Sequence, residues 1–176
     1  NISAAIVNGD KVAFYSEFEN DFDLPDNVIR IEQPDVSPHL FSAAIFLSTR
    51  VFEKHSFPYV ILRPKSIILG IGCRRGTSQI EINNAVQKHL DMLEICESCV
   101  KHIATVDSKK NEEGLVKYAE DLHIPLKVIE RKSIEQVEAE FECSDFVKAS
   151  VGVGCVAEPT AILSGDDAVL IGTKYR

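Results

Sequence analysis

Residues 66–81 read SIILGIGCRRGTSQIE, and this stretch decides the fold of the second half of the chain. Its apolar run at 67–71 is short and bounded by glycine, which is typical of a strand buried on both faces of a sheet. Ser78 and Glu81 have the spacing of a capping box, so a helix is predicted to begin there. The stretch therefore predicts a strand, a basic glycine-rich loop, and a helix whose free N–H groups point at the loop.

The predicted loop has the composition of an anion-binding site. Helix N-termini attract anions, and Arg74 and Arg75 add forked donors suited to carboxylate or phosphate. Its glycine spacing, G-x-G-x-x-x-G, is one residue longer than the dinucleotide fingerprint, and the Gly-Lys-Ser/Thr ending of a P-loop is absent. Asp107 lies too far along the chain to be the ribose-binding acid expected about 20 residues after the first glycine. A nucleotide-binding protein is therefore disfavoured, and two interpretations stay open: an anion-binding loop, or a structural turn with solvated arginines.

On the C-terminal side of this stretch, apolar runs alternate with amphipathic segments. We expect strands at 67–71, 102–106, 126–129 and 168–172, and helices at 78–93, 111–122, 133–141 and 155–163. Ser133 and Gln136 form a second candidate capping box. Alternation of strands and helices predicts an α/β fold, here a layered α/β/α domain around a central sheet.

The first 64 residues carry a less regular pattern. Asn8-Gly9-Asp10 is a hairpin signal between two expected strands, 3–7 and 11–15. Further strands are expected at 28–31, 43–47 and 59–62, and 50–56 is expected to be a loop or a short helix. Pro64 restricts the residue before it and lacks an N–H donor, which favours a boundary. We therefore predict a small, incomplete α/β region over 1–64, followed by the α/β/α domain over 65–176.

The composition narrows the classes of partner. The formal net charge is −8 and the sequence pI is near 5.1, so nucleic acid is not expected, because phosphate contacts require a basic face. No run approaches the roughly 18 apolar residues that a membrane span needs. No signal-peptide pattern is present either. We therefore expect a cytoplasmic protein without a membrane partner.

The five cysteines show no framework spacing, which favours a reduced environment. Cys96 and Cys99 form a lone CxxC without the second ligand pair of a zinc site, so packing at a helix end is favoured over metal or redox use. Cys73 lies at a predicted helix start, a position that lowers the pKa of a thiol. For Cys73 a filler role in a tight turn is favoured over a nucleophilic role, and no metal site is expected in the chain.

Three segments resemble, in the same order, the C-terminal domain of the cobalamin biosynthesis protein CbiG family, which CobE proteins share. They are GIGCRRGTS at 70–78, TVDSKKNEEGL at 105–115 and VGVGCVAEPTA at 151–161, called here the first, second and third motif. Residues 1–64 are similar to the middle region of CbiG, which stand-alone CobE proteins lack. The family's usual N-terminal domain has no counterpart in the sequence, so we expect a fragment or a processed form of a CbiG protein.

The resemblance implies a cobalt-precorrin-5A hydrolase of the anaerobic pathway of cobalamin (vitamin B12) biosynthesis. Such an enzyme opens the ring-A δ-lactone of a cobalt-corrinoid and releases acetaldehyde, giving cobalt-precorrin-5B. The alternative is a CobE-like module that binds a corrinoid intermediate without chemistry. The implied partner is the corrinoid substrate, which itself carries the cobalt, so no cofactor is expected. A homodimer, or an association with other cobalamin-pathway enzymes, is a further expectation.

The motifs also supply the candidate site residues. Glu112 and Glu158 are candidate general bases, and Lys109 is a candidate partner for an oxyanion or a carboxylate. The alternative for both glutamates is a charge that complements a helix dipole. The first motif is predicted to bind substrate through Gly70, Gly72, Cys73, Arg74, Arg75, Gly76, Thr77 and Ser78. Because all three motifs are placed at strand-to-helix junctions, we expect them to converge on one cleft at the carboxyl ends of the strands.

Overall fold

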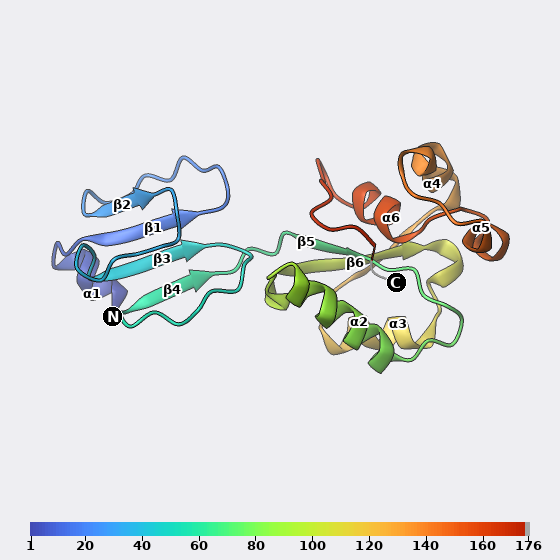
Figure 1. Cartoon of the computed structure of the whole chain (residues 1–176), viewed down its shortest axis with the longest axis horizontal. Coiled ribbons are helices and arrows are strands. Elements are labelled where there is room, and N and C mark those ends of the chain that lie inside the picture. Colours follow the sequence, from blue (N-terminus) through green and yellow to red (C-terminus); the bar gives the residue numbers. More distant parts are fainter. Residues whose placement is uncertain (175–176) are drawn as a thin grey trace. The chain divides into compact units, whose positions relative to one another are not determined.

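A computed structural model describes residues 1–174 and divides the chain into two compact units, Asn1–Pro64 and Lys65–Arg176. Each unit is built around its own parallel β-sheet (Figure 1). The predicted α/β fold class is therefore confirmed. The correspondence of residues 1–64 to the middle region of CbiG stays a prediction. Among residues 1–174, no helix combines the length and the hydropathy needed to cross a membrane.

The first unit is a four-stranded sheet with the order β2-β1-β3-β4, in which each neighbouring pair is parallel. Its strands are β1 (Val12–Ser16), β2 (Val28–Ile31), β3 (Ala43–Leu47) and β4 (Tyr59–Leu62). Successive residues of a strand point to opposite faces, so Val12 and Phe14 pack on one face and Ala13 on the other. The structure confirms the predicted strands at 28–31, 43–47 and 59–62, and it makes 50–56 a loop.

The N-terminal segment is a helix, α1 (Ile2–Val7), and the strand predicted there is wrong. The Asn1 side chain caps the helix by accepting a hydrogen bond from a backbone N–H at 3.2 Å. Ile2 and Ile6 have helical spacing and pack on the sheet. Gly9 follows with a φ of +80°, so the Asn-Gly signal ends a helix instead of turning a hairpin.

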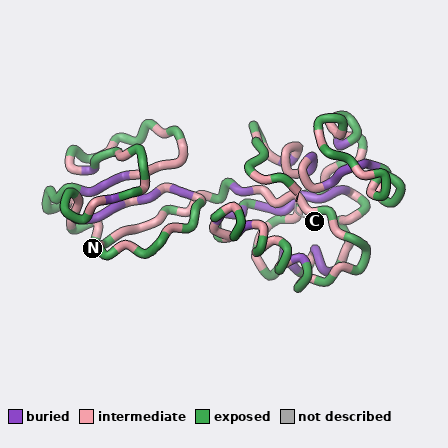
Figure 2. Tube along the Cα trace, in the orientation of Figure 1, coloured by how far each residue is buried: buried purple, intermediate pink, exposed green. Residues whose placement is uncertain are grey.

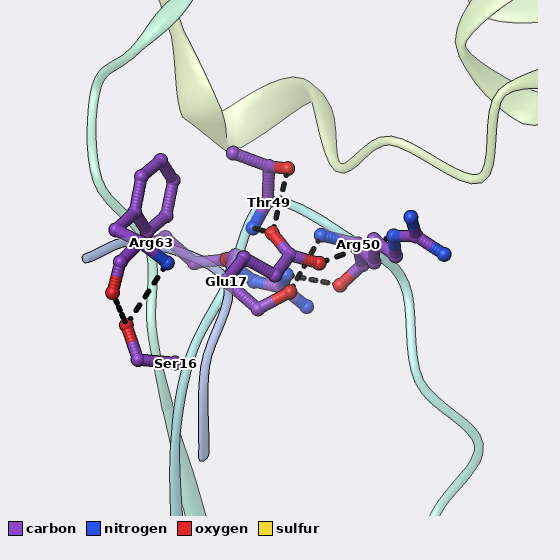
Figure 3. A network of polar contacts seen from close by, with 7 residues as sticks. Ser16, Glu17, Thr49, Arg50 and Arg63 are labelled. Atoms are coloured by element: carbon purple, nitrogen blue, oxygen red, sulfur yellow. Dashed lines mark hydrogen bonds and ion pairs between the residues drawn. The ribbon is translucent and has the colours of Figure 1, made fainter. Parts of the chain in front are cut away.

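The carboxyl ends of β1 and β3 are joined by a polar network around Glu17 (Figure 3). Glu17 Oε2 accepts hydrogen bonds from Thr49 N at 2.8 Å and Thr49 Oγ1 at 3.1 Å, and Glu17 Oε1 lies 3.2 Å from Arg50 Nε. Arg63 Nη1 donates to the carbonyl oxygens of Ser48 and Arg50. Contacts of this charge-assisted kind are the stronger class of hydrogen bond, so they hold the loop after β3 against the end of β1.

The second unit is a three-stranded parallel sheet with helices on both faces, which gives the predicted α/β/α layers (Figure 1). Its strands are β5 (Ile67–Gly70), β6 (Val100–Val106) and β7 (Leu126–Ile129), adjacent in that order. One face is covered by α2 (Gln79–Met92) and α3 (Glu113–Asp121). The other is covered by α4 (Arg131–Val137) and α6 (Ala157–Leu163), which are separated in the chain by α5 (Asp145–Val151).

β6 is buried on both faces because helices cover both. Ile103 packs with Leu115 and Tyr118 of α3, whereas Val106 packs with Ile134 of α4. Figure 2 shows this strand in purple, the colour of buried residues, over most of its length. Near-continuous burial is what a covered parallel strand requires, so the apolar runs correctly predicted all three strands of this sheet.

Two predictions for the second unit are wrong, and one helix was not predicted. α4 begins at Arg131, so the capping box proposed at Ser133 is wrong. α5 was not predicted, although Ser144 before it and the left-handed Gly152 after it are ordinary start and stop signals. The apolar run 168–172 is not a strand: it belongs to neither sheet, and its large side chains are exposed. High β-propensity describes packing on a sheet, and a run of such residues does not by itself place the segment beside a strand.

Candidate functional site

The first motif forms the loop between β5 and α2 and presents two guanidinium groups at a helix start. Ser78 and Glu81 form the predicted capping box: Ser78 Oγ accepts from Glu81 N at 3.3 Å, and Glu81 Oε2 accepts from Ser78 N at 2.9 Å. Thr77 Oγ1 donates to Arg74 O at 2.9 Å, which closes the turn. Arg74 and Arg75 are exposed. The loop therefore combines helix N–H groups with exposed positive charge, which suits an anion.

The second motif meets the first through Glu112, the residue before α3. Glu112 Oε2 accepts a hydrogen bond from Gly76 N at 3.2 Å, and Glu112 Oε1 accepts one from Lys109 Nζ at 3.0 Å. The Lys109 and Glu112 side chains are only 12% and 14% exposed, so this ion pair is largely shielded from water. Gly114 packs beneath the same loop, since a Cβ there would lie 2.2 Å from Thr77 O. The two motifs are thereby locked together.

The third motif packs against the two glycines that open the first motif. A Cβ on Gly70 would lie 1.8 Å from Ala157 O, and one on Gly72 would lie 2.9 Å from Val156 Cβ. These two glycines let the start of α6 approach β5 closely. Gly76 differs, because its surroundings are open and its φ is +77°. Of the three glycines, Gly76 is the one with space for a ligand.

Glu158 lies in the first turn of α6, directly after these contacts. Its Oε1 accepts a hydrogen bond from Lys174 N at 3.2 Å, and its Oε2 is buried without a hydrogen-bond partner among the described residues. The third motif follows α5 and not a strand, so the prediction that all three motifs occupy strand-to-helix junctions is wrong for this one. The motifs are nevertheless contiguous, because the first contacts both of the others.

The Glu112 carboxylate is held in its charged form. The hydrogen bond from the Gly76 N–H is the largest cause of its lowered pKa, and the hydrogen bond from Lys109 lowers the pKa further. A lower pKa makes a carboxylate a weaker base, and both oxygens already accept hydrogen bonds. The geometry therefore favours Glu112 as the group that positions Lys109 and the first motif, and its role as a general base stays a prediction.

Replacing Glu112 with glutamine is expected to lower the free energy of unfolding by about 1 kcal/mol at neutral pH, because charge-assisted hydrogen bonds are lost. Since the pKa is lowered in the folded protein, this stabilisation is present above the unfolded-state pKa of about 4.3 and is lost as the pH falls through the folded-state value. Urea unfolding of both proteins from neutral to strongly acidic pH measures the difference, which is expected to vanish at the acid end.

Glu113→Gln is the matched control for that experiment. Glu113 is the next carboxylate along the chain, and its side chain is 82% exposed in an ion pair with Lys117. Exposed pairs contribute little, so this variant is expected to leave the stability nearly unchanged. A Glu112→Gln protein as stable as the wild type at neutral pH would contradict the lock between the first two motifs.

Within the first motif, the Cys73 side chain packs into the core, and the helix start does not activate its thiol. Its side chain joins a core cluster that includes Ile82 and Leu115. Burial raises the pKa of the thiol, and the charge of Lys109 opposes this without reversing it. The expectation that this position lowers the pKa is therefore wrong, and the geometry favours the packing role.

The CxxC pair lies at the opposite edge of the sheet, before the amino end of β6. Cys99 is buried in a core cluster, and Cys96 Sγ lies 3.2 Å from Ser98 Oγ. Within residues 1–174 there is no group of three or more His, Cys, Asp or Glu side chains arranged to hold a metal ion.

Arg131 is a site residue that the sequence did not single out. It follows the carboxyl end of β7, and its Nη2 lies 3.6 Å from Oδ1 of Asp107, the residue after β6. Gly152 of the third motif leaves room for it, since a Cβ there would lie 2.9 Å from Arg131 Nη1. Arg131 Nε is buried without a hydrogen-bond partner among the described residues, and an acceptor atom of a ligand would satisfy this donor. A basic residue just after a predicted strand was the available signal.

Cations therefore follow every strand of the second sheet: Arg74 and Arg75 after β5, Lys109 and Lys110 after β6, and Arg131, the first residue of α4, after β7. Because these strands are parallel, their carboxyl ends share one edge of the sheet. Glu112 and Asp107 form ion pairs with Lys109 and Arg131 at this edge, whereas Arg74 and Arg75 are exposed, in a chain of net charge −8. Such an arrangement suits a ligand that carries several carboxylates.

Comparison with known proteins agrees with the motifs. Residues 67–176 match the family described as Cobalamin synthesis G C-terminus. A protein named cobalt-precorrin-5A hydrolase from Priestia megaterium is 29% identical over 188 residues, which cover 98% of this chain and 49% of that protein. One of the same name from Salmonella typhimurium is 32% identical over 113 residues, which cover 64% of this chain and 32% of that protein. The chain thus spans half, or less, of the length of these relatives.

A solved structure shares the fold. The crystal structure of CobE, described as a protein from the cobalamin biosynthetic pathway, matches with a TM-score of 0.51 at 27% sequence identity, covering 54% of this chain and 68% of that chain. The family match over 67–176 spans more than half of the present chain and contains all three motifs. The chain therefore belongs to the family of the cobalamin synthesis G C-terminus.

Proposed function

We propose that this chain is the part of a cobalt-precorrin-5A hydrolase that binds the corrinoid and takes part in opening its ring-A lactone, a step of cobalamin biosynthesis. The relatives that bear this name support the activity. The observation that carries the proposal is the set of cations that follow the three strands of the second sheet, with Arg74 and Arg75 exposed, in a chain that is acidic overall. The activity of the whole hydrolase is part of the proposal, because the relatives are about twice as long or longer.

The chemistry of the substrate fits this edge. Corrinoid intermediates carry many acetate and propionate side chains, and charge-assisted hydrogen bonds to carboxylates are worth about 1.5–3 kcal/mol each. Arg74 and Arg75 are exposed at the first motif, and the buried Nε of Arg131 has no hydrogen-bond partner among the described residues. We propose that these three arginines bind carboxylates of the corrinoid ring. Lys109, which Glu112 holds in place, is assigned to the oxyanion.

Lactone opening requires a base that activates water and a donor that stabilises the tetrahedral oxyanion. Glu158 is the better candidate base, because its Oε2 accepts no hydrogen bond from the described residues, whereas both oxygens of Glu112 do. Release of acetaldehyde then requires loss of the proton of the new alcohol. The conjugated ring accepts the electron pair of the broken C–C bond, so the protein mainly positions the substrate and moves protons.

Incubation of the purified chain with cobalt-precorrin-5A, with acetaldehyde measured through alcohol dehydrogenase and NADH, tests the proposal. We expect one acetaldehyde for each substrate consumed, and a rate at least about 100-fold lower for Glu158→Gln. Glu120→Gln, at an exposed position of α3, is the control and is expected to keep the wild-type rate. Corrinoid binding without acetaldehyde would favour the CobE-like binding module, and the absence of both would contradict the proposal.

The expected partners and location are proposals of the same kind. The net charge of −8 supports the proposal that nucleic acid is not a partner. We propose a cytoplasmic protein without a membrane partner that associates with a second copy of itself or with other enzymes of the pathway.

A further inference from the structure

Cys143 and Cys155 form a close thiol pair that the proposed hydrolysis does not use. Cys143 Sγ lies 3.5 Å from Cys155 Sγ and 3.4 Å from Glu138 O. Cys143 lies in the loop before α5, and Cys155 belongs to the third motif, just before α6. All five cysteines of the chain are reduced in the structure. The pair therefore encloses α5 between two facing thiols.

The backbone beside each cysteine already holds the pair together. Ser144 N, next to Cys143, donates to the carbonyl oxygen of Gly154, next to Cys155, at 2.7 Å. Glu138 holds the segment before Cys155 in place, because its Oε2 accepts a hydrogen bond from Gly154 N at 2.9 Å. An S–S bond is about 2.05 Å long, so the sulfur atoms need to approach by about 1.5 Å. Rotation of the side chains covers an approach of this size.

The two thiols differ in how far they are exposed to solvent. Cys143 is exposed, whereas Cys155 is 5% exposed. Burial, and secondarily the hydrogen bond with Cys143, raises the pKa of Cys155 to about 12. A reagent in solution therefore meets Cys143 first, and Cys155 is the buried partner that reacts second.

We propose that Cys143 and Cys155 are a thiol-oxidation site that closes reversibly into a disulfide at the start of α6. The oxidant is a low-molecular-weight disulfide. The Cys143 thiolate attacks one of its sulfur atoms and expels the other as a thiolate, leaving a mixed disulfide. Cys155 then loses its proton and attacks the Cys143 sulfur, which expels the second half of the oxidant. The protein loses two protons and two electrons, and the oxidant is reduced to two thiols.

The oxidation site adjoins the candidate catalytic residues. Cys155 precedes Val156, which fills the space beside Gly72, and it lies three residues before Glu158. Lys174 connects Glu158 with the loop before α5, because its backbone N donates to Glu158 Oε1 and its Nζ donates to Glu142 O. Closure of the disulfide ties the loop before α5 to the segment that positions Glu158. This consequence rests on the proposed function, whereas formation of the disulfide does not.

Incubation of the folded chain with oxidised glutathione, followed by alkylation and tryptic digestion without reductant, tests the proposal. Lys148 separates the two cysteines, so trypsin places them on different peptides, 133–148 and 149–174. We expect these two peptides to be joined by a disulfide, the intact mass to fall by two hydrogen atoms, and dithiothreitol to reverse both changes. The experiment needs no corrinoid, so its outcome is independent of the hydrolase proposal.

Two variants sharpen the result. Cys143→Ser changes an exposed side chain and is expected to abolish the joined peptides. Cys96→Ser removes a cysteine of the CxxC pair and is expected to leave the joined peptides at the wild-type yield. The proposal is overturned if both peptides carry alkylated cysteines after treatment with excess oxidant, or if the disulfide joins other cysteines instead.

Discussion

Gly70→Ala is expected to destabilise the second unit by about 3 kcal/mol or more. The added Cβ would lie 1.8 Å from Ala157 O and 3.0 Å from Ala161 Cβ, and neither atom belongs to a long side chain that can turn away. α6 would have to shift from its position on β5, which disrupts close packing between the two layers. Urea unfolding followed by circular dichroism measures the change in the free energy of unfolding.

Gly76→Ala is the matched control for this substitution. No atom lies within 4 Å of the Cβ that it would add, but the φ of Gly76 is +77°. Its expected cost is therefore about 1 kcal/mol, from the left-handed backbone alone. A Gly70→Ala protein no less stable than Gly76→Ala would contradict the close approach of α6 to β5.

The double variant Arg74→Ala with Arg75→Ala is expected to weaken the affinity for a cobalt-corrinoid by roughly 100-fold. Each guanidinium offers charge-assisted hydrogen bonds to a carboxylate, and the exposure of both arginines reduces the gain per bond. The loop is expected to keep its shape, because Thr77 Oγ1 bonds to the backbone oxygen of residue 74. Titration followed by the absorbance of the corrinoid measures the dissociation constant.

Lys101→Ala with Lys117→Ala provides a control with the same change in net charge. Lys101 lies near the amino end of β6, and Lys117 lies on the exposed face of α3 in an ion pair with Glu113. This variant is expected to change the affinity by less than about threefold, through long-range electrostatics alone. Equal losses in the two double variants would mean that net charge, and not the first motif, governs binding.

Elements with a local cause were predictable from the sequence. The capping box at Ser78 marked the start of α2, and continuous apolar runs marked the strands of the second sheet. Elements that depend on a distant partner were not. In α1, Ile2 and Ile6 pack on one face of the first sheet. The six residues of this helix do not by themselves show that a sheet lies beside them. The run 168–172 has the composition of a strand but pairs with neither sheet.

The candidate site was predictable as a set of motifs but not as a set of contacts. The hydrogen bond between Glu112 and Gly76 joins residues 36 positions apart, and no spacing rule relates them. Gly70 and Gly72 have the appearance of ligand-binding glycines, yet they make room for a helix from another layer. Whether a glycine faces a ligand or a protein segment is decided by tertiary packing, which one sequence does not display.

The contact of α6 with Gly70 and Gly72 limits how the second unit can respond to a ligand. With backbone atoms this close, no hinge is available between α6 and β5, so these two elements move as one rigid body. Gly76 at the tip of the loop has open space beside it, but its N–H donates to Glu112 Oε2 at 3.2 Å. We therefore expect the backbone of the loop to stay in place, and adjustment to corrinoids with different substituents to come from the exposed side chains of Arg74 and Arg75.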